Sequence, residues 1–362
     1  MTGLRLTAEA YRIPTDGPEG DGTLAWTATT LVLVRAEADG RTGIGWTYGP
    51  AAAAAVVPDL LAPVVGDLDP DDVPAVWTAM QRQVRNAGRP GIAGLALSAA
   101  DCALWDLKAR RHDLPLARLL GTARRHVPVY GSGGFTTYDD ERQHRQLAGW
   151  VHEQGIPRVK IKIGESCGTE VTRDLARMAA ARRTIGDDAE LYVDANGAYQ
   201  RKQAIRVAHA AAELNVRWYE EPVSSDDLDG LGLVRDRVLP DVAAGEYGFD
   251  LVYFHRMAPH VDCLQIDVTR CGGISEFLRI AAVADATGLQ VSGHCAPHQH
   301  LPVAAATPNL RHLEWFHDHV RIESMLFDGV QPATGGAVPV PMDRPGTGVE
   351  FRADRAQRYR VA

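Results

Sequence analysis

Two lysines stand two residues apart in a short apolar run, Arg-Val-Lys-Ile-Lys-Ile-Gly at residues 158–164. The run is typical of a buried strand, in which alternate side chains point to the same face. Lys160 and Lys162 would therefore share one face, with Val and Ile around them. Two buried ammonium groups repel each other unless negative groups lie opposite them. The pair predicts a charged site to which other segments contribute acids.

Single carboxylates or a histidine recur at the ends of the apolar runs that follow. Successive members are separated by 26, 26, 21, 27 and 20 residues, about the length of a strand plus a helix. They are Asp194, Glu220, Glu246, Asp267, His294 and Glu314. Strands with such connections form a parallel sheet with right-handed crossovers. Because the carboxyl ends of parallel strands lie at one edge, we expect these side chains at one opening.

The first three of these residues predict a metal site. Asp194, Glu220 and Glu246 would offer only oxygen ligands, which suit a hard cation such as Mg²⁺ better than zinc. A single acid at a strand end more often caps the next helix, so the prediction depends on the three together. A soft-metal site within residues 294–300 (His-Cys-Ala-Pro-His-Gln-His) is disfavoured because no second Cys/His group follows at a suitable spacing.

Two of the residues are candidates for proton transfer. Lys162 must be neutral to act as a base, and we expect burial beside Lys160 to lower its pKa. His294 is the second candidate, and Asp267 is expected one strand away. A hydrogen bond between these two would orient the imidazole and raise its basicity.

The elements that must position these residues fall into two parts. In the first, residues 2–12 and 28–46 have strand patterns, and the second of these predicts two strands joined at Asp39-Gly40. Residues 14–23 are rich in Gly, Pro and Asp and predict a mobile loop. Helical segments follow at 51–65, 71–85, 91–111 and 116–120. Strands followed by helices predict an α+β domain over residues 1–120.

In the second part, residues 121–320, strands alternate with helices. Eight strand candidates occur between Val127 and Trp315. We expect helices near 139–154, 171–185, 202–213, 248–257, 274–287 and 298–307. Parallel strand–helix units in this number close into a barrel, so the predicted class is α/β with a TIM-like barrel of seven or eight units. The tail, about 321–362, is expected to pack back on the first domain.

Length and composition exclude several classes of protein. The 362 residues, 45% hydrophobic and 23% charged, are typical of a globular protein larger than one small core. A net charge of −8 and a pI near 5.9 argue against nucleic acid or an anionic membrane as a partner. No apolar run reaches ~18 residues, and the start lacks a signal-peptide pattern. The five cysteines, without CxxC spacing, fit reduced thiols, so we expect a cytoplasmic protein.

Taken together, the motifs resemble the mandelate racemase subgroup of the enolase superfamily. They are Lys160-x-Lys162, Asp194-x-Asn196, Glu220-Glu221-Pro222, Gly245-Glu246, Asp267 with His294, and Glu314. The resemblance covers nearly the whole chain, because the first ~120 residues are similar to that family's capping domain. It implies a homo-oligomer with Mg²⁺ held by the three carboxylates, with Lys162 and His294 as opposed bases. It also implies Glu314 as a donor to the carboxylate of a small-molecule substrate, to which Lys160 can bind as well.

The implied chemistry is removal of a proton α to a carboxylate, which creates an enediolate whose charge the site must stabilise. We expect dehydration of a sugar acid to a 2-keto-3-deoxy acid. Racemisation or epimerisation of a 2-hydroxy acid and cycloisomerisation of a sugar-acid lactone are the alternatives. A metal-dependent hydrolase would need His-x-His at the first barrel strand, which Val127-Pro-Val-Tyr lacks. A non-catalytic sugar-acid binding protein would need none of the bases that are present.

Substrate choice is expected to depend on residues 14–26 and 47–52 of the first domain. Asp16, Glu19 and Asp21, without an arginine among them, disfavour a second carboxylate, which favours an aldonate over an aldarate. The candidate substrate-binding residues are Asn196, Trp26 and His317. Trp26 could pack on a ring or apolar substituent. Asn196 could reach the substrate or a metal-bound water, or could be an ordinary turn residue before glycine.

Overall fold

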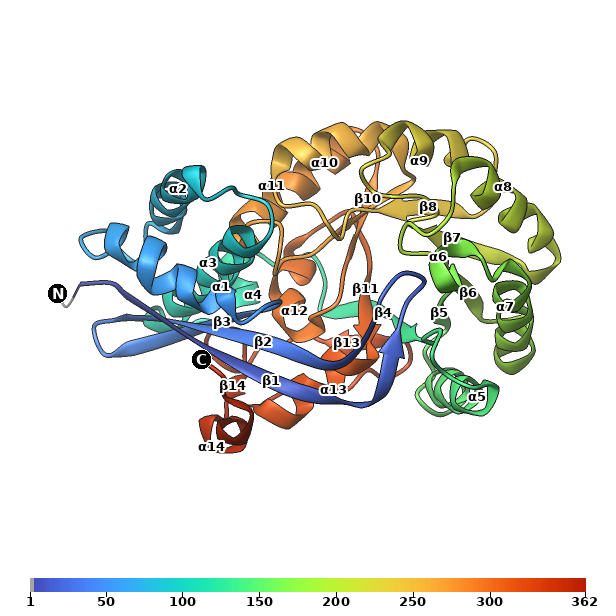
Figure 1. The fold of residues 1–362 in the computed structure, drawn as a ribbon. Coiled ribbons are helices and arrows are strands. Elements are labelled where there is room, and N and C mark those ends of the chain that lie inside the picture. Colours follow the sequence, from blue (N-terminus) through green and yellow to red (C-terminus); the bar gives the residue numbers. More distant parts are fainter. Residues whose placement is uncertain (1–2) are drawn as a thin grey trace.

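A computed structural model describes residues 3–362 of the protein and begins with a three-stranded antiparallel sheet (Figure 1). Its strands, in spatial order, are β1 (Arg5–Gly20), β2 (Ala25–Ala38) and β3 (Arg41–Tyr48). The predicted turn at Asp39-Gly40 is confirmed, and both residues have a positive φ, as the tight hairpin turn requires.

Helices cover one face of this sheet. They are α1 (Ala52–Val56), α2 (Val73–Gln83), α3 (Ile92–Arg111) and α4 (Leu116–Leu120), with π or 3₁₀ turns at Val57–Leu61, Ala62–Val64 and Val84–Asn86. The four predicted helical segments are thus confirmed. The long helix α3 lies directly on β3, because Gly43 and Gly45 leave no side chain between the two backbones. A Cβ atom at Gly43 would lie 2.2 Å from the Leu107 nitrogen.

Residues 14–23 differ from the prediction. They are mostly strand, because β1 continues to Gly20 and Glu19 pairs with Trp26 after a break in the register at Pro14. The hairpin of β1 and β2 reaches the barrel (Figure 1), where the Thr136 and Cys167 amides donate hydrogen bonds to the carbonyls of Gly20 and Gly22, both at 2.8 Å. These tertiary bonds and the strand pairing outweigh the turn-forming composition of the segment.

Eight parallel strands form a closed barrel, because the last pairs with the first. They are β4 (His126–Gly133), β5 (Arg158–Lys162), β6 (Glu190–Asp194), β7 (Val216–Glu220), β8 (Asp241–Ala244), β9 (Cys263–Ile266), β10 (Gln290–Gly293) and β11 (Leu310–Phe316). The predicted fold class is confirmed. The carboxyl ends of all eight strands open on the same side, as parallel pairing requires.

The helices between the strands surround the barrel (Figure 1). They are α5 (Asp140–Ala148), α6 (Glu165–Gly168), α7 (Val171–Ile185), α8 (Arg201–Ala210), α9 (Leu228–Arg235), α10 (Leu251–Met257), α11 (Gly273–Ala286) and α12 (Pro297–Ala306), with short turns at Gly149–Glu153, Ala212–Leu214 and Ala258–His260. Helix α9 was not predicted. Its two glycines lower helix propensity, whereas the Asp227 side chain caps its first turn by accepting a hydrogen bond from the Gly230 amide.

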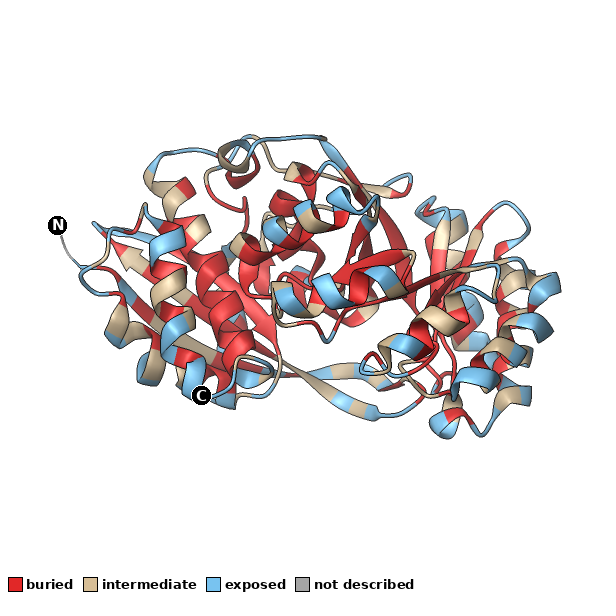
Figure 2. Cartoon of the chain, turned by 90° about the horizontal axis from the view of Figure 1, so that it is seen from above, coloured by how far each residue is buried: buried red, intermediate tan, exposed pale blue. Residues whose placement is uncertain are grey.

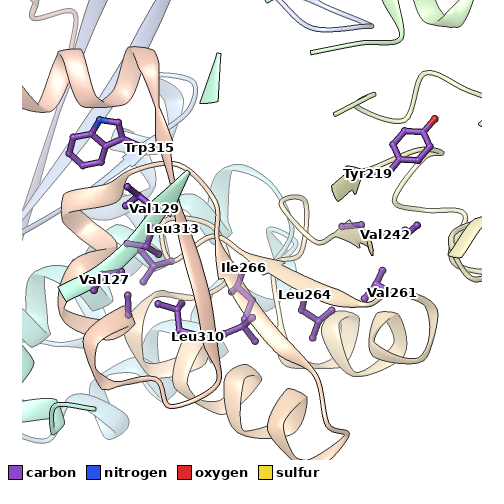
Figure 3. Packing of buried hydrophobic residues seen from close by; sticks show 14 of the residues in the cluster. Val127, Val129, Tyr219, Val242, Val261, Leu264, Ile266, Leu310, Leu313 and Trp315 are labelled. Atoms are coloured by element: carbon purple, nitrogen blue, oxygen red, sulfur yellow. The ribbon is translucent and has the colours of Figure 1, made fainter. Parts of the chain in front are cut away.

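Buried residues, red in Figure 2, concentrate in the barrel strands and in the helices next to them. Between strands and outer helices lies the main apolar cluster, in which Val129 of β4 and its ladder partner Leu313 of β11 lie side by side (Figure 3). Inside the barrel, Tyr130, Tyr192 and Trp218 pack together. These rings fill the interior below the carboxyl ends of the strands and form the floor of the opening.

The tail contacts both parts of the molecule. It consists of α13 (His317–Leu326), β12 (Phe327–Asp328), β13 (Ala337–Pro339), β14 (Glu350–Phe351), α14 (Ala353–Ala356) and a 3₁₀ turn at Gln357–Tyr359. Ile322 and Leu326 pack on Trp46 of the N-terminal sheet, whereas β13 pairs with β4 of the barrel. The domain boundaries near 120 and 320 stay a prediction. Within residues 3–362, no helix is both long and apolar enough to cross a membrane.

Candidate active site

Three buried carboxylates converge at the open end of the barrel. Asp194 and Glu220 are the last residues of β6 and β7 and are ladder partners, and Glu246 lies two residues beyond β8. One oxygen of each lies within 4.8 Å of one oxygen of the others. Glu246 Oε2 is buried without a hydrogen-bond partner. Such a set of buried oxygen ligands fits a hard divalent cation such as Mg²⁺.

The two lysines of β5 face these carboxylates, as the alternation predicts. Lys160 forms an ion pair with Glu220 and lies 2.8 Å from Glu314 and 3.4 Å from Asp194. The Lys162 ammonium donates to Asp194 Oδ2 at 2.5 Å. Both side chains are buried.

The pKa of Lys162 is shifted in the direction opposite to the prediction. Burial lowers the pKa of Lys162, and Lys160 lowers it further, but Asp194 and Glu246 outweigh both and raise it. The prediction included the repulsion between Lys160 and Lys162 but not the attraction between the Lys162 ammonium and the carboxylate of Asp194. A cation held by the carboxylates would take up their charge and repel the ammonium, which makes loss of its proton easier.

His294 and Asp267 form the expected pair. His294 lies directly after β10 and donates from Nδ1 to Asp267 Oδ2 at 2.8 Å, while its Nε2 lies 3.2 Å from Glu246 Oε2. Burial raises the pKa of Asp267, but the hydrogen bond and charge of His294 lower it to about 2. Asp267 therefore stays ionised and fixes the imidazole with Nε2 directed to the carboxylate cluster.

Lys162 and His294 lie on opposite sides of the opening. Their strands, β5 and β10, are separated by β4 and β11 on one side of the ring and by four strands on the other. Lys162 contacts Asp194 at one edge of the cluster, and His294 contacts Glu246 at another. A carbon atom bound between them would meet, on each face, a group that can transfer a proton.

Glu314 is held in the site by several hydrogen bonds. It accepts from Ser132 Oγ at 2.6 Å and from the Cys295 amide at 2.9 Å, in addition to its ion pair with Lys160. Burial raises the pKa of Glu314, but Lys160 and His294 lower it well below its usual range. Glu314 is therefore ionised here. Its role as a donor stays a prediction, and it requires that a bound substrate carboxylate adds the negative charge that favours its protonation.

Two residues beside the metal ligands differ in how well they were anticipated. The backbone amide of Asn196 donates a hydrogen bond to Asp194 Oδ1 at 2.9 Å. The side-chain Oδ1 of Asn196 is buried without a hydrogen-bond partner and is therefore available to a ligand. Strand alternation predicted that Glu221 faces away from the metal site. The strand ends at Glu220, however, and Glu221 has a φ of 37°. The strand alternation on which the prediction rested therefore does not extend to Glu221, and burial together with the charge of Glu246 raises the pKa of this residue.

The N-terminal hairpin of β1 and β2 contacts the barrel beside the candidate site. Trp26 donates from Nε1 to Glu19 Oε2 at 3.0 Å and meets Phe135 edge to face. It packs on a small apolar cluster that also contains Phe316 and Cys295. The predicted contact residue His317 pairs with Asp16 of the hairpin at 2.9 Å, which ties α13 to the hairpin. Contact of Trp26 or His317 with a substrate stays a prediction.

Sequence reasoning did not identify several residues that orient the site. Gln265 donates to Glu220 at 3.0 Å, Trp218 Nε1 donates to the same carboxylate at 2.8 Å, and Arg270 lies 3.3 Å from Asp267. Gln265 could have been found, because it is a polar residue inside an apolar strand, two positions before Asp267 and therefore on the same face. The contact of Arg270 arises from a turn that no spacing rule anticipates.

Comparisons with known proteins agree with this geometry. Residues 21–121 match the N-terminal domain family of mandelate racemase and muconate lactonizing enzyme, and residues 143–355 match the enolase C-terminal domain-like family. The chain is 33% identical over 376 residues to the 3,6-anhydro-alpha-L-galactonate cycloisomerase of Streptomyces coelicolor, covering 99% of both chains. It is 33% identical over 319 residues to the L-talarate/galactarate dehydratase of Salmonella typhimurium, covering 83% of this chain and 78% of the relative.

Solved structures extend the likeness to the whole chain. A mandelate racemase/muconate lactonizing enzyme-like protein from Rubrobacter xylanophilus superposes with a TM-score of 0.96 at 48% identity and 100% coverage of both chains. A racemase from Streptomyces coelicolor, solved with bound magnesium, superposes with a TM-score of 0.92 at 32% identity over 99% of both chains.

Proposed function

The chain belongs to the mandelate racemase and muconate lactonizing enzyme family of the enolase superfamily, and we propose that it is a Mg²⁺-dependent dehydratase of a monocarboxylic sugar acid. Its relatives are dehydratases, cycloisomerases and epimerases, so the enzyme is a lyase or an isomerase. The observation that carries the proposal is the placement of Lys162 and His294 on opposite sides of three buried carboxylates.

In the proposed reaction, Lys160 binds one carboxylate oxygen of the substrate and orients the α-carbon between the two bases. Bound Mg²⁺, held by Asp194, Glu220 and Glu246, would supply the positive charge that stabilises the enediolate oxygens. Lys162, as the neutral amine, accepts the α-proton. His294, as the imidazolium held by Asp267, donates a proton to the β-hydroxyl group, which leaves as water. The resulting enol becomes the 2-keto-3-deoxy acid.

The charges around the hairpin support a substrate with one carboxylate. Arginines do reach this region, from α5 and α13, which the sequence argument on residues 14–26 overlooked. Arg142 pairs with Asp16 at 2.7 Å, and Arg321 pairs with Asp318 at 2.5 Å. Their charges are thus balanced, and Glu19 Oε1 is buried without a partner. A hydroxyl group suits this region better than a second carboxylate.

Cycloisomerisation is the second candidate. The apolar wall formed by Trp26, Phe135 and Phe316 would pack on a ring more closely than on an extended polyol. A cycloisomerase also matches 99% of the chain at 33% identity. In that reaction the same α-proton is removed or added, while a ring C–O bond opens in place of the loss of water.

Proton NMR in D₂O distinguishes these outcomes. The protein with Mg²⁺ is incubated with aldonates, aldarates, their lactones, anhydro sugar acids and aryl 2-hydroxy acids, and the α-proton signal is followed. We expect an aldonate to lose it and to yield a 3-deoxy-2-keto product. A ring-opened or ring-closed isomer would support the cycloisomerase, and exchange with an intact skeleton would show a racemase or epimerase. Light scattering of the same sample measures the oligomeric state, which we expect to be an even-numbered homo-oligomer.

Glu19 predicts a pH dependence of substrate binding. Glu19 is fully buried, and burial and the charge of Asp318 raise its pKa to about 8. Because the pKa of Glu19 is raised in the folded protein, the packing of the hairpin around this side chain is favourable while Glu19 is protonated. This contribution is lost as the pH rises through about 8. We expect KM to rise several-fold between pH ~7 and ~9, and Glu19→Gln, which mimics the neutral acid, to remove most of this rise. Initial rates at fixed Mg²⁺ measure it.

The matched control for Glu19 is Glu37→Gln, which changes an acid of the same sheet that pairs with Arg5 away from the barrel. Glu37→Gln should keep the pH dependence of the unmodified enzyme. An identical rise of KM in Glu19→Gln would show that another group titrates.

A further inference from the structure

A thiol that the proposed reaction does not use lies inside the active site. Cys295 directly follows His294 and is buried. Its Sγ lies 3.2 Å from His294 Nε2 and 3.3 Å from Glu314 Oε2, and Nε2 lies 3.6 Å from the same Oε2. Sulfur, nitrogen and oxygen thus form a triangle at the opening of the barrel.

The main chain holds this triangle in place. Cys295 and Ala296 both have a positive φ, 52° and 38°, which side chains with a Cβ rarely adopt. The conformation is fixed by two hydrogen bonds, from the Cys295 amide to Glu314 and from the Ala296 amide to His319 Nδ1 at 3.2 Å. The backbone therefore keeps the thiol beside His294 although a relaxed strand end would turn it elsewhere.

The dimensions of the triangle lie within a few tenths of an ångström of those of a tetrahedral soft-metal site. With Zn–S of about 2.3 Å and Zn–N and Zn–O of about 2.0–2.2 Å, the ligand atoms of tetrahedral zinc are about 3.3–3.6 Å apart. The three distances here are 3.2, 3.3 and 3.6 Å. Glu246 Oε2 lies 3.2 Å from His294 Nε2, so that a second carboxylate oxygen borders the triangle.

We propose that His294, Cys295 and Glu314 form a second metal site, which binds a thiophilic divalent cation such as Zn²⁺ or Cd²⁺ and thereby inhibits the enzyme. The thiolate favours these cations over Mg²⁺, which prefers oxygen. The cation would bind the Nε2 atom, which could then no longer carry the proton that His294 donates. The inhibition rests on the proposed function, in which His294 transfers a proton. Binding of the cation to His294, Cys295 and Glu314 does not depend on that function.

The ligand set differs from the one that the spacing of residues 294–300 suggested. His298 is not part of it, because its Nδ1 pairs with Glu323 at 2.6 Å. His300 accepts the Val268 amide at Nε2, 2.9 Å away, and is likewise occupied. The third ligand is Glu314, which comes from the next strand and which no local motif reveals.

Cd²⁺ tests binding directly, because a cadmium–thiolate bond gives an ultraviolet charge-transfer band. The reference protein is full-length Cys167→Ser with Mg²⁺ present, since Cys167 is exposed and would bind Cd²⁺ by itself. We expect one equivalent of Cd²⁺ to produce the band in the reference and no band in Cys167→Ser/Cys295→Ser. If the serine variant does not fold, as judged by circular dichroism, Cys167→Ser/Cys295→Ala replaces it. A band of equal size without Cys295, or no band in the reference, would overturn the site.

Inhibition is measured on the same proteins with the substrate found by NMR. Zn²⁺ should inhibit Cys167→Ser at a concentration at least about tenfold lower than it inhibits the double variant, in line with the loss of one ligand. Equal sensitivity of the two proteins would refute inhibition through Cys295. The Cd²⁺ band is read without any substrate, so failure of the proposed function would leave the binding test intact.

Discussion

Lys162→Ala and His294→Asn should each lower kcat at least about 10³-fold, because each removes one of the two groups that transfer protons. The two variants should differ in what remains. In His294→Asn, Lys162 is still present beside Asp194, so the α-proton should exchange with D₂O although the β-hydroxyl group is not lost. In Lys162→Ala both exchange and elimination should stop. Proton NMR of the substrate measures exchange and product formation in one experiment.

Exposed residues of α8 provide matched controls for these two changes. Lys202→Ala and His209→Asn make the same substitutions outside the barrel opening and should keep the turnover of the unmodified enzyme. Unchanged turnover in Lys162→Ala or His294→Asn would contradict the two-base assignment. Exchange in Lys162→Ala but not in His294→Asn would interchange the two roles while leaving the site in place.

The barrel and its charged opening could be predicted because they depend on short-range rules. Strand alternation put Lys160 and Lys162 on one face, and parallel pairing brought the ends of β6 and β7 together, so that Asp194 and Glu220 had to be neighbours. Such contacts follow from the fold class alone. The hairpin at Asp39-Gly40 was predictable for a similar reason, because its turn chemistry is local.

Contacts that depend on tertiary structure could not be predicted in the same way. Residues 14–20 have a loop-like composition, and pairing with β2 together with bonds to the barrel keeps them as strand. Glu221 escapes strand alternation because its backbone leaves the strand directly after Glu220. The pKa of Lys162 depends on a carboxylate at 2.5 Å, which the sequence locates only to the nearest strand. The position of the N-terminal hairpin beside the site and the pKa shifts within the site are therefore the features that could be learned only from the structure.

Removal of divalent cations with EDTA should abolish turnover, and Mg²⁺ should restore it. Asp194, Glu220, Glu246 and the neighbouring Glu221 are all buried, and the positive groups that pair with these acids are Lys160, Lys162, His294 and Arg270. A cation that binds only the folded state adds stability, about 2.7 kcal/mol at a hundredfold excess over its Kd. We therefore expect the Tm to rise with Mg²⁺ as activity returns.

Glu220→Gln is the sharpest variant of this site, because Glu220 contacts neither Lys162 nor His294 directly. Its partners are Lys160, Trp218 and Gln265. The Gln amide keeps the shape of the side chain, and its oxygen can still accept a hydrogen bond from Lys160 or Trp218, so the variant should fold without Mg²⁺. We expect its Mg²⁺ requirement for activity to rise at least about tenfold and the Mg²⁺-dependent rise in Tm to shrink accordingly.

Glu276→Gln is the control for Glu220→Gln, because Glu276 is also buried but lies on α11 and pairs with Arg279. A loss of activity in Glu220→Gln with an unchanged Mg²⁺ requirement would contradict Glu220 as a ligand. Since Gln keeps the shape of the side chain and removes only its charge, such a result would mean that the acid acts on Lys160 alone. A raised requirement without a lower kcat at saturating Mg²⁺ would instead separate metal binding from proton transfer, as expected if Lys162 and His294 carry the chemistry.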